Sequence, residues 1–414
     1  NQCCVHFSNK NLPNQDAFSI VAELNLLLRI FGLSAIYRDA TELKYNNPIW
    51  KSVIFIIIFI AANTYSIYFK LTTVDVESKF TFIDAIHLVY LLGYIQYVFD
   101  TISVYKHGRH AYVDYFHLYD YIDSIIGMPY YIRAKKSVRN MCILFIFIAI
   151  CTFIIELFTW VDSFNFAVLN IYSVELLYVT IRILAALDMI ANCVQISIRL
   201  ETIGDILEYY YNNDGSVPGI VNDDYDKIWV TKDVKNVNYL DHLKITSNLR
   251  HKMMSHSSRC YTLLVEQSDF LNLKYGPRIL IAFSLYLLDM VLLLNIIIRL
   301  LMGKVVFPGA PGYLTILSSL GRILSYTIIL FCGINRCEQT YRQTERIVRL
   351  INHLLISKKI VRNLRGMLME LKDVVISRPI TFHAVNFFRV DYATLVSLAS
   401  AIVTYTIIFL QNLQ

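Results

Sequence analysis

Residues 53–60 have the sequence Val-Ile-Phe-Ile-Ile-Ile-Phe-Ile, eight large apolar side chains with no polar position among them. A helix built from these residues is apolar all round, and such a helix belongs in a protein core or in a membrane. The apolar stretch extends over residues 49–69, and a membrane span needs roughly 20 mainly apolar residues. Charged residues make up only 17% of the chain, whereas soluble domains carry about 25%. The sequence therefore predicts an all-α integral membrane protein.

Six further segments have the length and composition of a membrane span, so we predict seven transmembrane helices. A soluble helical bundle would show a polar face on each helix, and these segments mostly lack one. The seven predicted spans are residues 49–69, 83–105, 141–160, 168–200, 279–301, 313–332 and 392–411.

The distribution of Lys and Arg predicts the orientation of these spans, because basic residues gather in the cytoplasmic loops of membrane proteins. Of the 38 basic residues, 31 lie on the side that includes the N-terminus and only 3 lie on the other. We therefore predict a cytoplasmic N-terminus and, with an odd number of spans, an extracellular C-terminus. This orientation is the opposite of that in G-protein-coupled receptors.

The polar segments on the cytoplasmic side are predicted to be helical extensions of spans four to seven that pack together as an anchor. Residues 240–275 are polar with a helical pattern, and apolar residues recur at three- and four-residue spacing in residues 335–355 and from residue 360. The last of these helices must end by Arg378, because Pro379 disfavours helical geometry in the residue before it. We divide the chain into a cytoplasmic N-terminal segment (1–48), spans one to six with their extensions (49–334), the anchor helices (335–391) and the seventh span (392–414).

Motifs of the common enzyme classes are absent from the sequence. There is no phosphate-binding Gly-x-x-x-x-Gly-Lys loop, no dinucleotide-binding glycine motif, no His-Glu-x-x-His and no Gly-x-Ser-x-Gly. The net charge of +6 is small for this length, and a nucleic-acid-binding protein would show a concentrated basic face. We expect neither enzymatic activity, nor a cofactor or metal, nor a nucleic-acid partner.

The C-terminal 35 residues resemble the end of insect gustatory receptors, a family related to the insect odorant receptors. Those proteins close with Thr-Tyr, five mainly apolar residues and then Gln-Phe, and here Thr404-Tyr405-Thr-Ile-Ile-Phe-Leu-Gln411 has the same spacing. Residues 382–391 (Phe-His-Ala-Val-Asn-Phe-Phe-Arg-Val-Asp) are similar to the family's approach to its last span. The small-residue run at 397–403 is similar to the family's as well.

Two positions depart from the family pattern. Asn412 stands where a Phe usually follows the Gln, so an aromatic constriction is not expected there. Thr406 stands where many sweet-taste members carry Glu, which favours a bitter or plant-derived ligand over a sugar. Fructose-type members also lack this Glu, so a fructose-type ligand stays open.

The resemblance implies a ligand-gated, non-selective cation channel that is a homotetramer with a central pore, in the plasma membrane of sensory neurons. It implies a small-molecule tastant and membrane lipid as partners, and no G protein. The seventh span of each subunit would line the pore, and each subunit would hold its own ligand pocket within the bundle.

For the pore, small and hydroxyl-bearing residues on one face of the seventh span are the candidates. Thr404, Ile408 and Gln411 follow helical spacing, and Ser400 lies one turn before Thr404. In a tetramer these residues form hydroxyl, apolar and amide rings, and a narrow apolar ring blocks ions by dewetting. The alternative is that the small residues let helices of one subunit pack closely.

For the ligand pocket, the candidates are polar and aromatic residues within the spans, since ionisable groups in a bilayer are costly and mark function. Counted from the outer end, several of them reach a similar depth of roughly 10–20 Å. The alternative is a set of salt bridges that join Glu175 or Asp289 to Arg182 or Arg322. The candidates are Tyr90, Tyr94, Glu175, Tyr178, Arg182, Asp289, Asn295, Ser318 and Arg322.

Two other functions stay open from the sequence. A membrane transporter would require internal repeats and interrupted helices near the membrane midplane, and the sequence shows neither. A seven-span receptor of another type is opposed by the distribution of Lys and Arg. A chemosensory channel is the function that the sequence favours.

Overall fold

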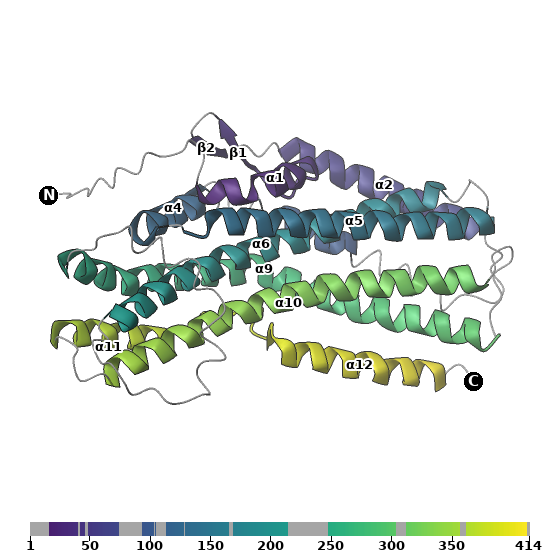
Figure 1. Cartoon of the computed structure of the whole chain (residues 1–414). Helices are drawn as coiled ribbons and strands as arrows, with labels where there is room; N and C mark the ends of the chain where they lie inside the picture. Colours follow the sequence, from purple (N-terminus) through teal and green to yellow (C-terminus); the bar gives the residue numbers. More distant parts are fainter. Residues whose placement is uncertain are drawn as a thin grey trace.

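The computed structural model describes most of the chain between residues 16 and 411. The described residues are 16–39, 42–45, 49–73, 93–102, 104, 113–127, 129–164, 169–213, 247–303, 312–356 and 362–411, and some side chains within these ranges are not described. Long helices lie side by side along most of the length of the molecule (Figure 1). The labelled helices are α1 (Ala17–Ile30), α2 (Ile49–Thr73), α4 (Tyr115–Ile126), α5 (Tyr131–Phe164), α6 (Leu169–Asn213), α9 (Ser247–Leu301), α10 (Gly312–Ile356), α11 (Arg362–Ser377) and α12 (Tyr392–Gln411).

Four of these helices, α5, α6, α9 and α10, are long and apolar enough to cross a membrane. Shorter apolar helical stretches lie within α2 and α12, at Val53–Ala62 and Tyr392–Ile408. Most of the second predicted span, residues 83–105, lies outside the described residues. The seven spans and their orientation therefore remain predictions, whereas several apolar helices of spanning length are present.

Two of the helices predicted for the polar segments are continuous with spans, as parts of α9 and α10, whereas the third, α11, is a separate helix and not an extension of the seventh span. Helix α9 has 55 residues and begins at Ser247, and α10 has 45 residues and runs through the boundary that we drew at residue 334. Helix α11 ends at Ser377, one residue before Arg378 and two before Pro379, as predicted. We call the end of the molecule that holds α11 the anchor end. Helix α12 runs from the anchor side toward the opposite end, where α9 ends and α10 begins (Figure 1).

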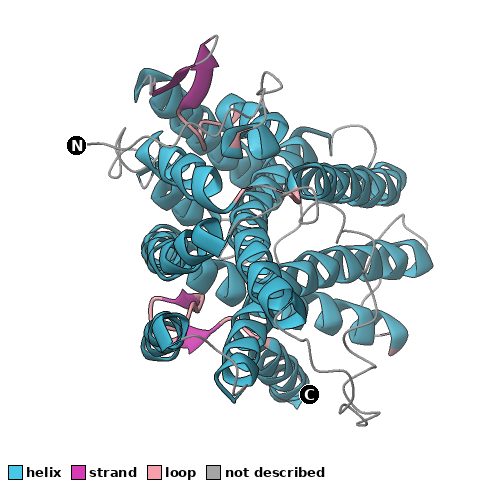
Figure 2. Cartoon of the chain, turned by 60° about the vertical axis from the view of Figure 1, so that its left-hand side comes forward, coloured by secondary structure: helices cyan, strands magenta, loops and turns pink. Residues whose placement is uncertain are grey.

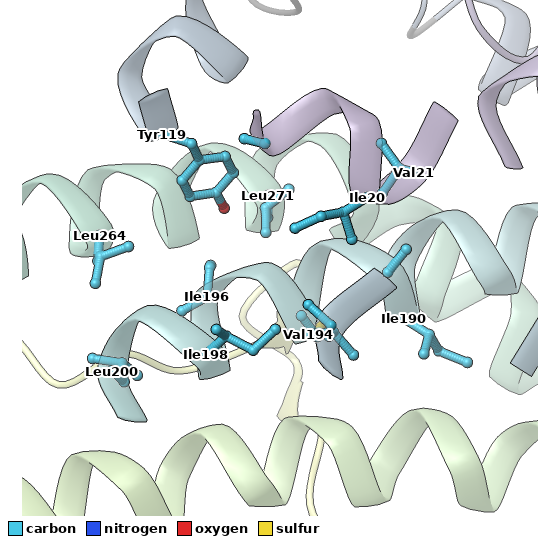
Figure 3. Packing of buried hydrophobic residues seen from close by; sticks show 14 of the residues in the cluster. Ile20, Val21, Tyr119, Ile190, Val194, Ile196, Ile198, Leu200, Leu264 and Leu271 are labelled. Atoms are coloured by element: carbon cyan, nitrogen blue, oxygen red, sulfur yellow. The ribbon is translucent and has the colours of Figure 1, made fainter. Parts of the chain in front are cut away.

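The N-terminal segment contains a buried helix that we did not predict. Helix α1 begins with a capping box in which the Asp16 carboxylate accepts a hydrogen bond from the Ser19 amide. A backbone N–H group of the first turn therefore has a partner within the helix start itself. Phe18, Val21 and Leu24 of α1 are buried against the other helices. Figure 3 shows this packing, with Ile20 and Val21 facing side chains of α6 and α9. Helix α1 therefore packs on α4, α5 and α6 through its buried face.

Two short antiparallel hairpins complete the fold (Figure 2). Strands β1 (Ile36–Asp39) and β2 (Glu42–Tyr45) pair with Ile36 opposite Tyr45. Strands β3 (His383–Ala384) and β4 (Phe388–Arg389) pair with His383 opposite Arg389. The second hairpin is the connection between α11 and α12.

The β3–β4 hairpin is clamped between α9 and α10. Asn272 of α9 donates to the Thr381 carbonyl over 2.7 Å and accepts from the His383 amide over 3.1 Å. Tyr341 of α10 accepts from the Phe382 amide over 3.0 Å, and its hydroxyl lies 3.0 Å from the Val390 carbonyl. The backbone entering α12 is therefore fixed to both long helices.

The turn of this hairpin has an unusual backbone and a close contact. Val385 and Asn386 have positive φ angles of 49° and 62°, a conformation that is costly for a β-branched residue. Gly276 of α9 lies so near the turn that a Cβ there would stand 3.1 Å from the Val385 amide nitrogen. A glycine at 276 is what permits the hairpin to approach α9.

Candidate ligand cavity and pore face

Helix α12 packs on α9 and α10 through one face. Leu398 and Ile402 of α12 pack against a cluster of Tyr286 and Met290 from α9 and Tyr326 from α10. These apolar contacts place α12 against a cluster that contains two aromatic side chains of the bundle. The same two tyrosines take part in a cavity behind it.

This cavity has a volume of about 120 Å³ and lies between α6, α9, α10 and the helical segment at 93–102. Most of its wall is apolar, and the aromatic part consists of Phe283, Tyr286 and Tyr326. Its polar residues are Gln96, Arg182 and Arg278, and Val390, just before α12, also lines it. An apolar chamber with a few polar groups is the usual form of a small-molecule site.

Two ion pairs flank Tyr326. Arg182 donates to Asp289 Oδ2 over 2.7 Å, and its guanidinium carbon lies 4.8 Å from the centre of the Tyr326 ring. Arg322 donates to Glu156 Oε1 over 2.6 Å, which joins α10 to α5. One of the salt bridges that we weighed, Arg182 with Asp289, is therefore present. The partner of Arg322 is Glu156, which the sequence analysis did not single out.

A smaller cavity of about 20 Å³ lies on the other side of Tyr326, beside the Arg322–Glu156 pair. A cavity needs at least about 10–15 Å³ of such volume to hold one water molecule. This cavity therefore has room for water and not for a ligand. The 120 Å³ cavity is the better candidate for a ligand site.

The structure brings some of the predicted pocket residues together and leaves others apart. Arg182, Asp289 and Arg322 meet around Tyr326, whereas Asn295 and Ser318 are buried and Tyr94 is half-buried, with none of these three in the wall of either cavity. Tyr90 lies outside the described residues. The side chains of Glu175 and Tyr178 are likewise outside the part of the chain that the structure describes.

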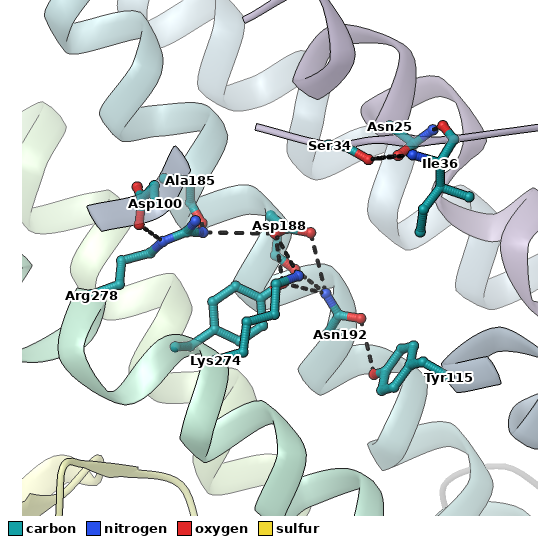
Figure 4. A network of polar contacts seen from close by, with 11 residues as sticks. Asn25, Ser34, Ile36, Asp100, Tyr115, Ala185, Asp188, Asn192, Lys274 and Arg278 are labelled. Carbon is teal, nitrogen blue, oxygen red and sulfur yellow. Dashed lines mark hydrogen bonds and ion pairs between the residues drawn. The ribbon is translucent and has the colours of Figure 1, made fainter. Parts of the chain in front are cut away.

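A larger polar network lies beside the cavity, toward the anchor end (Figure 4). Arg278 of α9 donates to Asp100 over 2.5 Å and lies 3.7 Å from Asp188 of α6. Asp188 also accepts from the Tyr275 hydroxyl over 2.5 Å and lies 3.4 Å from Lys274 Nζ. Two acidic and two basic side chains therefore compensate one another where α6, α9 and the 93–102 segment meet.

The network extends to α4 through tyrosines and a second ion pair. Tyr115 donates to Asn192 over 3.0 Å and shares a 2.7 Å hydrogen bond with Tyr119. Arg199 lies over the Tyr119 ring at 3.9 Å and donates to both carboxylate oxygens of Asp123, over 2.8 and 2.6 Å. Burial raises the pKa of the Asp123 carboxyl above its ordinary value, and the adjacent Arg199 guanidinium offsets only part of this shift.

A signal in the sequence was available for the residues that we missed. Glu156, Asp100 and Asp188 all lie inside segments that we predicted as spans, at 141–160, 83–105 and 168–200. The rule that singled out Arg322 and Asp289 applies equally to them. Gln96, by contrast, is uncharged, and its importance depends on the cavity that the fold creates.

The candidate pore residues all lie on the exposed face of α12. Ser400, Thr404 and Gln411 are exposed, and Ile408 is 45% exposed. Thr404 donates to the Ser400 carbonyl of its own helix over 2.9 Å, so its hydroxyl is satisfied without a second helix. Thr406, in contrast, is only 6% exposed and points toward its own subunit.

Comparison with known proteins supports the fold. The structure of insect olfactory receptor OR5 from Machilis hrabei in complex with eugenol matches with a TM-score of 0.61 and 12% sequence identity, over 94% of this chain and 97% of that one. A structure of the same receptor with no ligand in its description matches with a TM-score of 0.60 and 13% identity, over the same shares of the two chains. No protein-family model matches the sequence, and no curated protein does. The resemblance to insect chemoreceptors is therefore confirmed at the level of the fold.

Proposed function

We propose that this chain is the subunit of a ligand-gated, non-selective cation channel of the gustatory type, which opens when a small tastant binds. Two observations support a chemosensory receptor. The chain shares its fold with an insect olfactory receptor, one structure of which is a complex with eugenol, and its C-terminal motif resembles gustatory receptors. The channel would be a homotetramer in the plasma membrane of sensory neurons.

The observation that carries this proposal is the polar face of α12. Leu398 and Ile402 turn toward α9 and α10, whereas Ser400, Thr404 and Gln411 are exposed on the opposite side. Polar side chains on the lipid-facing side of a membrane helix are unfavourable, so this face fits a water-filled pore between subunits better than lipid. No charged residue lies on this face, so the pore should discriminate little among monovalent cations.

The packing of α12 offers a direct route from ligand to gate. Tyr286 and Tyr326 line the 120 Å³ cavity, and the cluster that they form with Met290 is the one against which Leu398 and Ile402 of α12 pack. Val390 lines the same cavity at the start of α12. A ligand that moves either tyrosine changes the surface on which α12 rests. The ligand would open the channel because its affinity is higher for the conformation with α12 in the open position than for the closed one.

We further propose that the ligand is a bitter or plant-derived compound and not a sugar. A sugar needs several hydrogen-bond partners, and the cavity wall is mostly apolar. Thr406, the position of a Glu in many sweet-taste members, is buried away from the exposed face of α12. A fructose-type ligand would require polar groups beyond those that line this cavity.

Whole-cell recording from cells that express this chain alone tests the proposal. A panel of bitter and plant-derived compounds should evoke currents whose reversal potential changes little when sodium, potassium and caesium are exchanged. A sodium-to-potassium permeability ratio above about tenfold requires a selectivity filter and contradicts the proposed pore face. Ligand uptake without a ligand-evoked conductance would favour a transporter instead.

A further inference from the structure

One polar side chain in the wall of the 120 Å³ cavity has an acceptor that accepts no hydrogen bond from the described residues. Gln96 lines the cavity and is only 5% exposed, and its Oε1 has no hydrogen-bond partner among the described residues. A buried acceptor left without a partner is unfavourable, so a ligand that donates a hydrogen bond to it gains affinity. One turn further along the same helical segment, Asp100 Oδ2 is also buried without a partner in the described part of the chain. Two neighbouring acceptors thus lack a donor.

The charges around this cavity, in contrast, are paired. Arg182 is held by Asp289, and Arg278 is held by Asp100 with Asp188 nearby. A charged ligand would have to break one of these buried pairs or bring in an uncompensated charge, and both are costly. The cavity therefore suits a neutral molecule.

The volume and the wall restrict the ligand further. An engineered apolar cavity of about 150 Å³ is large enough to bind benzene. A chamber of about 120 Å³, with Phe283, Tyr286 and Tyr326 in its wall, fits a single small ring or a short branched hydrocarbon. A purely hydrocarbon ligand of this size would leave Gln96 Oε1 without a hydrogen bond, whereas a ligand with a hydroxyl group could donate one.

We propose that the cavity binds a small, neutral, largely apolar molecule through one hydroxyl group, which donates to Gln96 Oε1. A phenol or a compact alcohol has this chemistry. The inference rests on the proposed function, because it names the ligand class of the same site, and it assigns Gln96 as the residue that selects for the hydroxyl. The remainder of the wall contributes shape and apolar area.

The test uses two probes and measures binding without relying on current. p-Cresol carries a hydroxyl, and toluene has a nearly identical body without one. Isothermal titration of the purified full-length protein in lipid nanodiscs, with empty nanodiscs as the partition blank, gives the affinity of each. In the wild type, p-cresol should bind more tightly than toluene after the blank is subtracted, and this comparison needs no variant.

Gln96→Leu removes the amide and keeps similar bulk, so it should weaken p-cresol binding by about threefold to tenfold and leave toluene binding unchanged or stronger. Gln267→Leu is the matched control, because Gln267 of α9 is a buried glutamine outside the cavity wall, and its Oε1 has no hydrogen-bond partner among the described residues. It should change neither affinity. Ala282→Leu places bulk in the cavity wall and should weaken both probes.

Three results overturn the inference: equal affinity of p-cresol and toluene in the wild type, a p-cresol preference that survives Gln96→Leu, or binding of both probes that is indifferent to Ala282→Leu. If any of these three results is found and other compounds still evoke a cation current, the proposed ligand class is wrong and the proposed channel function stands. If Gln96-dependent binding is found and no compound evokes a cation current, the proposed channel function is wrong.

Discussion

Arg182 of α6 and Asp289 of α9 form an ion pair with an Nη1–Oδ2 distance of 2.7 Å, and the two side chains are 12% and 11% exposed. Arg182 lines the 120 Å³ cavity, and its guanidinium lies over the Tyr326 ring. Asp289 therefore offsets the charge of a guanidinium that belongs to a residue of the cavity wall. We expect this ion pair to disfavour charged ligands in the cavity.

Removing the carboxylate should reverse the charge preference of the cavity. Asp289→Asn keeps the side-chain shape and removes the carboxylate that Arg182 contacts, so the net charge beside the cavity rises by one and an anionic ligand becomes more favourable. We expect p-toluate to bind the variant at least about tenfold more tightly than the wild type, and p-cresol to change by less than about threefold. Titration of both probes in nanodiscs checks this. Unchanged exclusion of p-toluate shows that Arg182 does not face the ligand.

The Arg322–Glu156 pair is expected to act on stability. Arg322→Ala removes the guanidinium that contacts Glu156, whose side chain is 7% exposed, and breaking a buried pair costs about 3–5 kcal/mol. We expect loss of surface expression and a lower melting temperature. Adding Glu156→Gln to the same chain should restore most of the surface expression and of the melting temperature, since the buried carboxylate is then replaced by a neutral amide.

The contrary outcome for this pair is also informative. Normal expression and melting of Arg322→Ala, together with a loss of ligand-evoked current, would assign Arg322 to the ligand site, as the sequence suggested. Fluorescence-detected size-exclusion chromatography after heating gives the melting temperature, and surface biotinylation gives the expression.

The turn that leads into α12 should become more stable when its strain is removed. Val385 has a φ of 49°, which costs a side-chain-bearing residue about 1–2 kcal/mol, whereas glycine adopts it freely. Val385→Gly should raise the stability of the purified protein by up to about 1 kcal/mol. Asn386→Gly is the control, because Asn tolerates this region and should gain little. A lower melting temperature for Val385→Gly would show that the Val385 side chain stabilises the folded protein by more than its backbone strain destabilises it.

Much of the fold follows from patterns that are local in the chain. The apolar stretches at 141–160 and 279–301 predict helices whatever their neighbours, and α11 ends where Pro379 requires it. Helix α1 was not predicted, although Asp16 and Ser19 form a capping signature before an apolar run. The structure shows that this helix packs on the bundle, because its Phe18 and Leu24 side chains are buried.

The site was harder to predict because it depends on which helix faces turn toward each other. Helical spacing placed Arg322 on a face, yet its partner Glu156 lies 166 positions away in the chain, and the rotation of two helices selects that partner. The cavity is a void between four segments, so no single segment encodes it. Gln96 is uncharged, so the sequence rule for buried charges does not select it, and it became a candidate only because it lines the cavity.

The apolar barrier of the pore is predicted at Ile408. Asn412 replaces the family's usual Phe, so the constriction moves to the ring of Ile408 on the face of Thr404. Ile408→Ser places a hydroxyl from each subunit in this ring, and water should enter the closed state. We expect ligand-free cation current several times that of the wild type at matched surface expression.

Ile407→Ser is the matched control for this barrier. Ile407 and Ile408 are 50% and 45% exposed in the isolated chain, so burial does not distinguish them and the prediction depends on the direction each faces in the tetramer. Ile407→Ser should produce much less ligand-free current. A leak at Ile407 and silence at Ile408 place the barrier on the neighbouring face of α12.

The proposed pore is tested most directly by modification of cysteines placed on α12 during recording. Thr404→Cys puts a thiol on the exposed polar face, and Ile402→Cys puts one on the face that packs against α9 and α10. A small cationic thiosulfonate applied with an activating ligand should suppress the Thr404→Cys current irreversibly by more than about half, since the added charge stands in the ion path. It should leave the wild type, with its own cysteines, and Ile402→Cys unchanged. Block of Ile402→Cys with no effect at Thr404→Cys would contradict the account, because the ions would then pass along the other face of this helix.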